Sequence, residues 1–195
     1  MRLFVALDIN DEIRERIARF LEGVRGFAPD VRWVRPESLH ITLKFIGEKS
    51  EEEAGTIVRT MEAIHANAFG INSRGYGFFP TARAPRVFWV GIEPEPKLTS
   101  LAAAVDSSLC AIGIAKEEHA FNAHLTLART GGGSGSPSRQ KSDAPNRRFQ
   151  RLQEKLASLS PPEFGTVTAR EFFLYKSQLG PGSSTYTKLT RFGLQ

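Results

Sequence analysis

Cysteine is almost absent from this sequence of 195 residues, because Cys110 is the only one. A single cysteine excludes an intramolecular disulfide and a metal cluster held by several thiolates. The stretch around it, residues 101–110, is mostly apolar and typical of a helix. We therefore expect a buried helical thiol that does not act as a nucleophile.

Long hydrophobic runs are also lacking, since charged residues interrupt the apolar stretches before they reach the length of a membrane span. The apolar segment at the N-terminus meets Asp8 too early for a signal peptide. We expect a cytoplasmic protein that does not associate with membranes.

Acidic residues are outnumbered, with 21 Asp and Glu against 26 Lys and Arg and a net charge of +5. This balance makes polyanions plausible partners. The hydrophobic content of 41% and the 14 phenylalanines suffice for a sizeable core. The length fits one domain over residues 1–195, built from one body or from two small lobes.

Histidine is scarce as well, yet two of the four histidines open nearly identical runs. Residues 40–44 read His-Ile-Thr-Leu-Lys, and residues 124–128 read His-Leu-Thr-Leu-Ala. In a strand, successive side chains point to opposite faces, so His and Thr share one face and the aliphatic residues the other. Two such strands facing each other would line one pocket with two imidazoles and two hydroxyls.

Transfer at phosphorus without a metal is the chemistry that suits this set of groups. One neutral imidazole, from His40 or His124, takes the proton of the attacking water, and one imidazolium protonates the departing oxygen. The hydroxyls of Thr42 and Thr126 can donate to the non-bridging phosphate oxygens. A single motif would be explained as well by a polar spot on an ordinary strand, but two copies favour the functional interpretation.

The paired motifs resemble those of the two-histidine (2H) phosphoesterases. Their context is similar to the RNA 2′,3′-cyclic phosphodiesterases, which are also called 2′-5′ RNA ligases. The resemblance runs over essentially the whole chain, and the supporting stretches are residues 2–7, 33–39, 45–47, 85–91 and Arg129.

This resemblance implies hydrolysis of a terminal RNA 2′,3′-cyclic phosphate to a 2′-phosphomonoester, with no cofactor and no metal. It implies His40 as the proton donor and His124 as the proton acceptor, although the residues alone do not break the symmetry between them. The expected partners are RNA 3′ ends bearing a cyclic phosphate or small cyclic nucleotides, and we expect a monomer.

Two alternatives stay open at this point. The same site could run in reverse as a 2′-5′ ligase, and the lack of a nucleotide-binding motif would make such ligation independent of ATP. The chain could instead be a non-catalytic module that binds RNA ends. Binding alone does not need two imidazoles of opposite protonation, which disfavours this alternative.

Arginine and lysine residues near the motifs are further candidates. Arg129 follows the second motif and could pair with phosphate oxygens, and Lys44 alternates onto the face of His40. The same alternation places Phe45 on the opposite, core face. Either cation could instead be an ordinary surface residue, but the position of Arg129 just past the motif favours the functional interpretation, whereas the support for Lys44 is weaker because strand ends splay toward solvent.

Possible substrate contacts lie in two other stretches. Arg83 and Arg86 in the 81–86 loop combine charge with neighbouring phenylalanines, as single-strand nucleic-acid binders do. Tyr175, Ser177 and Tyr186 resemble a stretch that borders the substrate groove in the family.

The periodicities and breakers predict twelve helices and strands, and the mixture of both, partly joined by hairpins, indicates an α+β fold. With the repeated motif we expect two intertwined, pseudo-symmetric lobes, each an antiparallel sheet with helices on its outer face, flanking a central groove that carries both motif strands. Residues from about 130 to 145 are rich in Gly and Ser and predict a flexible loop or, alternatively, a linker. The predicted strands are 2–8, 31–34, 39–46, 69–79, 87–92, 121–128, 167–175 and 185–192, and the predicted helices are 11–25, 51–65, 97–111 and 146–158.

Overall fold

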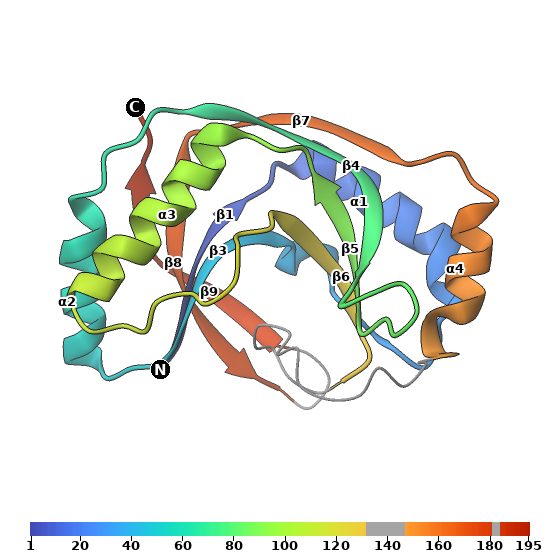
Figure 1. Ribbon diagram of the computed structural model, residues 1–195, viewed down its shortest axis with the longest axis horizontal. Helices are drawn as coiled ribbons and strands as arrows, with labels where there is room; N and C mark the ends of the chain where they lie inside the picture. The colour runs from blue at the N-terminus through green and yellow to red at the C-terminus, as the bar shows by residue number, and fades with distance from the viewer. Residues whose placement is uncertain (132–146, 181–183) are drawn as a thin grey trace.

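The computed structural model describes residues 1–131, 147–180 and 184–195 (Figure 1). Most of the predicted loop at about 130–145 lies outside these residues. The helices are α1 (Asp11–Val24), α2 (Glu51–Glu62), α3 (Pro96–Ala111) and α4 (Gln150–Ala157), and the strands are β1 (Arg2–Asp8), β2 (Arg32–Trp33), β3 (His40–Glu48), β4 (Phe69–Phe79), β5 (Val87–Ile92), β6 (His124–Arg129), β7 (Glu163–Ala169), β8 (Glu171–Leu179) and β9 (Ser184–Gly193).

The described strands form a nine-stranded sheet in the order β7-β4-β5-β6-β3-β1-β8-β9, with β2 paired to β6. Every strand pair is antiparallel. The two motif strands, β3 and β6, are neighbours at the centre, where Ile41 pairs with Leu125. The predicted α+β class is therefore confirmed.

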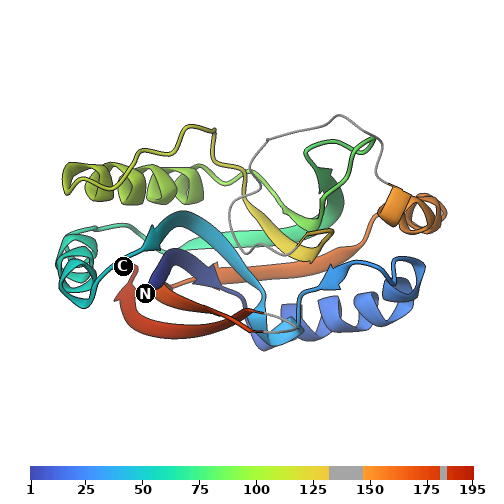
Figure 2. The same cartoon turned by 90° about the horizontal axis from the view of Figure 1, so that it is seen from below.

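Two halves meet at this central pair. The first half contains β3, β1, β8 and β9 with α2 and α3, and the second contains β6, β5, β4 and β7 with α1 and α4. Figures 1 and 2 show α2 and α3 together at one end of the molecule and α1 and α4 at the other. This arrangement confirms the predicted pair of lobes around the motif strands, and the two lobes share one sheet that does not close.

Local sequence explains the helices at both ends. The Asn10 side chain caps α1 by accepting from the Ile13 amide, and Ser50 with Glu53 forms a reciprocal capping box on α2. In α1 the buried residues recur every three or four positions, which presents one apolar face to the sheet. These residues are Ile13, Ile17, Leu21 and Val24.

The end of the chain differs from the prediction. The sequence predicts one strand over residues 167–175. In the structure this range covers the end of β7 and the start of β8, which are separate strands on either side of Arg170. Strand β7 pairs only along β4 and forms one edge of the sheet, so it buries few side chains. Its Gly165 has a positive φ of +108°. This weak apolar pattern is why the sequence did not reveal β7.

Other boundaries also shift. Cys110 lies on α3 as predicted but is exposed, so its predicted burial is wrong. The buried face of α3 is the opposite one, which carries Leu101, Val105 and Leu109. Strand β6 begins at His124, later than the predicted residue 121. Among the described residues, no helix is both long and apolar enough to cross a membrane.

A small aromatic cluster stands apart from the main core on the first half of the sheet. Its buried members come from β1 and β8, and Phe45 and Tyr186 pack against them. The cluster forms a rigid apolar backing beside the first motif strand. The buried members are Phe4, Ala6, Phe173 and Tyr175.

Candidate active site

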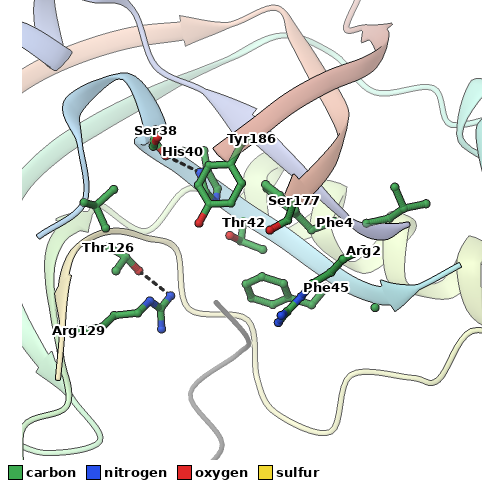
Figure 3. A pocket seen from close by; sticks show the side chains of 13 residues that line it. Arg2, Phe4, Ser38, His40, Thr42, Phe45, Thr126, Arg129, Ser177 and Tyr186 are labelled. Atoms are coloured by element: carbon green, nitrogen blue, oxygen red, sulfur yellow. Dashed lines mark hydrogen bonds between the residues drawn. The ribbon is translucent and has the colours of Figure 1, made fainter. Parts of the chain in front are cut away.

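Both motifs open into adjoining cavities at the junction of the two halves. The first cavity is lined by His40 and Thr42 from β3 and by Thr126 and Arg129 from β6 (Figure 3). The second contains His124 and shares Thr42 and Arg129 with the first. The structure therefore brings together the five motif-region residues that the sequence pointed to.

Each motif histidine is oriented in the same way by a backbone carbonyl two residues earlier. His40 Nδ1 lies 2.8 Å from the Ser38 carbonyl oxygen, and His124 Nδ1 lies 2.7 Å from that of Asn122. A carbonyl only accepts, so Nδ1 is the protonated, donating nitrogen in both rings. The Nε2 atom of each neutral ring is then left with a free lone pair for proton transfer.

Burial changes the proton affinity of both rings. Desolvation lowers the pKa of His40 to about 4, and repulsion from Arg129 adds to this effect against the raising influence of the Ser38 carbonyl and Asp8. Desolvation also lowers the pKa of His124, again with help from Arg129. Both imidazoles are therefore neutral near pH 7 in the free protein.

A β-bulge in β3 overturns two of the predicted side-chain directions. Val5 of β1 pairs with Lys44 and Ala6 pairs with Thr42, so Leu43 is skipped and the alternation changes phase. Lys44 is turned inward and only 3% exposed, so it does not share the face of His40. Phe45 instead lines the cavity beside His40 and Thr42, and its predicted core position is wrong.

Lys44 lines the second cavity, and its ammonium group is held there in a largely buried ion pair. Its Nζ lies 2.5 Å from the Asp106 carboxylate and donates to the Ala115 carbonyl at 2.8 Å. Asp106 also accepts from the Glu117 amide at 3.0 Å. The pair therefore fastens the segment that leads to the second motif onto the strand of the first.

The second motif strand carries the equivalent bulge. Phe88 of β5 pairs with Ala128 and Trp89 pairs with Thr126, so the residue between them is skipped. The bulge directs Arg129 into the cavity, where it donates to the Thr126 hydroxyl at 3.3 Å. Desolvation lowers the pKa of Arg129, and an arginine so placed remains a cation aimed at the space between the motifs.

Aromatic rings brace both histidines. Tyr186 meets His40 edge-on with ring centroids 5.0 Å apart, and Phe4 lies on another side at 4.8 Å. Phe79 meets His124 edge-on, also at 5.0 Å. These contacts limit rotation of the imidazoles and exclude water from their faces.

The remaining candidates divide between the two cavities and their surroundings. Ser177 and Tyr186 line the first cavity, and Arg86 lines the second. Tyr175 lies behind the first cavity, stacked on Phe4, and burial raises its pKa. Arg83 is exposed in the loop before β5 and lines neither cavity.

Several residues that line these cavities were missed in the sequence, among them three that carry a charge or a ring that could contact a substrate. Arg2 lines the first cavity, and His119 and Phe121 line the second. Arg2 could have been found from the alternation of β1, because it shares a face with Phe4. The other two lie in a segment without strand or helix, where periodicity gives no signal.

In the part of the chain that the structure describes, no three His, Cys, Asp or Glu side chains form a group that could bind a metal ion. The motif region itself supplies two imidazoles, two threonine hydroxyls and the Arg129 guanidinium to these cavities.

Known proteins share both the sequence pattern and the architecture. The profile of the family described as LigT-like phosphoesterase matches residues 7–89 and 90–186, and each matched stretch contains one motif. A protein of Archaeoglobus fulgidus named RNA 2′,3′-cyclic phosphodiesterase is 34% identical over 98% of this chain and 99% of its own. A protein of Thermus thermophilus with the same name is 33% identical over 100% of this chain and 91% of its own.

Solved structures agree with these matches. The crystal structure of Escherichia coli LigT complexed with 3′-AMP superposes with a TM-score of 0.76 at 28% identity, covering 99% of this chain and 97% of that one. The match includes both halves of the sheet and hence both motif strands. The chain therefore belongs to the LigT-like phosphoesterases, the two-histidine family that its paired motifs resemble.

Proposed function

We propose that this protein is a phosphodiesterase that opens the 2′,3′-cyclic phosphate at an RNA 3′ end. Relatives that match nearly the whole chain are named RNA 2′,3′-cyclic phosphodiesterase, and a structural neighbour is LigT complexed with the nucleotide 3′-AMP. The observation that carries the proposal is the matched pair of histidines, each with Nδ1 held by a carbonyl and Nε2 left for proton transfer.

Two proton transfers accompany the reaction. A water oxygen attacks phosphorus while His124 Nε2 accepts the water proton, and the bond from phosphorus to the ribose 3′ oxygen breaks as His40 Nε2 donates a proton to that oxygen. The product carries a 2′-phosphomonoester and a free 3′-hydroxyl. His40 ends neutral and His124 ends protonated, and exchange with solvent restores both.

Charge on the non-bridging oxygens is held by the groups between the two rings. The Thr42 and Thr126 hydroxyls are neutral donors, and Arg129 supplies a fixed cation within reach of Thr126. Substrate binding also prepares His40 as the acid. A phosphodiester anion beside Arg129 offsets the repulsion that lowers the His40 pKa, so the imidazolium becomes more stable in the complex.

Product analysis tests this proposal. An oligonucleotide ending in a 2′,3′-cyclic phosphate is incubated with the protein, and ³¹P NMR identifies the resulting ester. We expect a 2′-phosphomonoester and the same rate in EDTA. A 3′-phosphate would contradict the bond that breaks, and a loss in EDTA that zinc restores would contradict a reaction carried by histidines.

The two alternatives give different outcomes in the same assay. Joining to an added 5′-hydroxyl end would indicate ligation, which the names of the relatives do not favour. Binding without turnover at any pH would indicate a module that only recognises RNA ends.

A further inference from the structure

The first cavity extends beyond the motif residues to a second polar end on β1 and β8. Arg2 and Ser177 both line it, and they are direct partners across the two strands. Partners in an antiparallel pair project from the same face of the sheet, so these two side chains emerge side by side. Figure 3 shows both on the side of the cavity that also holds Phe45.

The hydroxyl group of Ser177 is buried and forms no hydrogen bond in the described structure. The residue as a whole is only 7% exposed. A buried hydroxyl without a partner is unfavourable, so the Ser177 hydroxyl is free to donate to an acceptor on a ligand. Among the residues that the structure describes, Arg2 forms no ion pair, although it is partly buried.

Along the backbone, Arg2 and Ser177 stand some way from the motif end of the cavity. Arg2 lies four residues from Ala6, and Ala6 pairs with Thr42. Four strand residues span about 13 Å, with Phe4 and Phe45 in the space between. Arg2 and Ser177 thus line the end of the cavity away from the backbone of Thr42, where they are placed for a second group of the substrate.

We infer that Arg2 and Ser177 form a subsite for a second phosphate, the internucleotide phosphodiester on the 5′ side of the terminal nucleotide. This inference rests on the proposed function. A guanidinium beside a hydroxyl donor matches the charge and the acceptors of a phosphodiester, whereas a neutral base edge requires no cation. The subsite makes the enzyme prefer an RNA end over a mononucleotide.

The test uses two dinucleotides that end in a 2′,3′-cyclic phosphate. One has the natural diester between its nucleosides, and the other has a neutral methylphosphonate there. We expect wild-type kcat/KM to be about 10-fold to 100-fold higher for the natural diester, the effect of one hydrogen-bonded charge pair. This comparison needs no variant, so it holds even if a substitution impairs folding.

Variants then assign the preference to these residues. Arg2→Gln should reduce the ratio of the two kcat/KM values to about 1, Arg2→Lys should keep part of it, and Ser177→Ala should lower it by a smaller factor. Arg19→Gln is the matched control, because it removes the same charge from an exposed site on α1 and should leave the ratio unchanged.

The results distinguish a failure of the subsite from a failure of the proposed function. Equal turnover of both dinucleotides by the wild type would overturn the subsite, and so would an Arg2→Gln variant that keeps the full preference. If the wild type hydrolyses neither dinucleotide nor a mononucleoside 2′,3′-cyclic phosphate, the proposed function itself fails and the subsite falls with it.

Discussion

The two halves of the sheet present their histidines by the same backbone geometry. In the first half Ser38 holds Nδ1 of the motif histidine, and in the second half Asn122 does so. Each motif strand then skips one leucine in a β-bulge, Leu43 in one and Leu127 in the other. The bulges turn the fifth residue after each histidine into the central cavities.

The side chains at equivalent positions nevertheless differ. The fifth residue after the histidine is Phe45 in the first half and Arg129 in the second. The residue paired with the motif histidine on the neighbouring strand is Asp8 of β1 in the first half and Gly91 of β5 in the second. The backbone is therefore nearly symmetric, whereas the charge around the reacting phosphate is not.

This difference gives the two nearly identical motifs different electrostatic surroundings. An imidazole near a carboxylate gains stability as a cation, and one near a guanidinium loses it. Asp8 raises the pKa of His40, and no carboxylate acts on His124 in this way. Burial nevertheless outweighs Asp8 and lowers the pKa of His40 to about 4 in the free protein, so the proposed role of His40 as the acid depends on the bound phosphate anion to stabilise its imidazolium.

The largest expected effect follows from removing either histidine. His40→Ala and His124→Ala should each lower kcat by about 10²–10⁴, the usual contribution of one general acid or base. The double variant should lose far less than the product of the two, since groups that act in one step are non-additive. Steady-state kinetics on a cyclic-phosphate oligonucleotide measures this, and near wild-type turnover in either single variant would contradict the mechanism.

Exchanging the fifth residues tests the asymmetry itself. Arg129→Gln should lower kcat by about 10²–10³, because it removes the charged donor that lies beside Thr126 in the first cavity. Phe45→Leu retains an apolar side chain and should lower kcat/KM by roughly 10-fold or less. If the two variants lose equally in kcat, the charge at residue 129 does not distinguish the halves.

The threonines should show smaller and similar effects. Thr42→Ala and Thr126→Ala each remove one neutral donor to a charged oxygen, with an expected loss of about 10-fold to 100-fold in kcat. Serine at either position keeps the hydroxyl and should restore most of the rate. A serine variant as slow as the alanine variant would indicate a packing role.

The smallest expected effect is a shift in pH between two rate profiles, that of kcat/KM, which reports the free enzyme, and that of kcat, which reports the complex. In the free enzyme the His40 pKa is about 4 and the His124 pKa is lowered below its usual 6.5, so both limbs of kcat/KM should lie below pH 6.5. Bound phosphate favours the charged rings, so both limbs of kcat should move to higher pH. A kcat profile displaced to lower pH would contradict this account.

Stability must be followed over the same range. The unfolded chain binds a proton at His40 near pH 6.5, whereas the folded chain does so only near pH 4. The unfolding free energy should therefore fall as the pH is lowered from about 6.5 toward 4. Denaturation by urea at several pH values separates this effect from the catalytic limbs.

Much of the fold was predictable because its elements carry strong periodic signals. The helices α1 and α3 and the strands β4 and β5 agree with the sequence to within one or two residues. Strand β7 was not predictable, since an edge strand with an interior glycine buries too few side chains. Cys110 shows a related limit, because an apolar helix does not reveal which of its small residues faces outward.

The site was predictable as far as the regular alternation of its strands extends. Although they line two adjoining cavities and not the single pocket that was expected, His40, Thr42, His124 and Thr126 follow that alternation. Phe45 and Lys44 do not, because the bulge lies between them and the motif. Only the positional match of Phe45 with Arg129 could have signalled it, since both stand five residues after a motif histidine.

The assignment of His40 as acid and His124 as base is tested most directly by changing the leaving group. In a 2′,3′-cyclic phosphate whose 3′ oxygen is replaced by sulfur, the departing thiolate does not need a proton. We predict that His40→Ala loses about 10²–10⁴ in kcat on the oxygen substrate but regains nearly the wild-type rate on the sulfur substrate. His124→Ala should be slow on both. Rescue of His124→Ala in place of His40→Ala, or rescue of neither, would contradict the account.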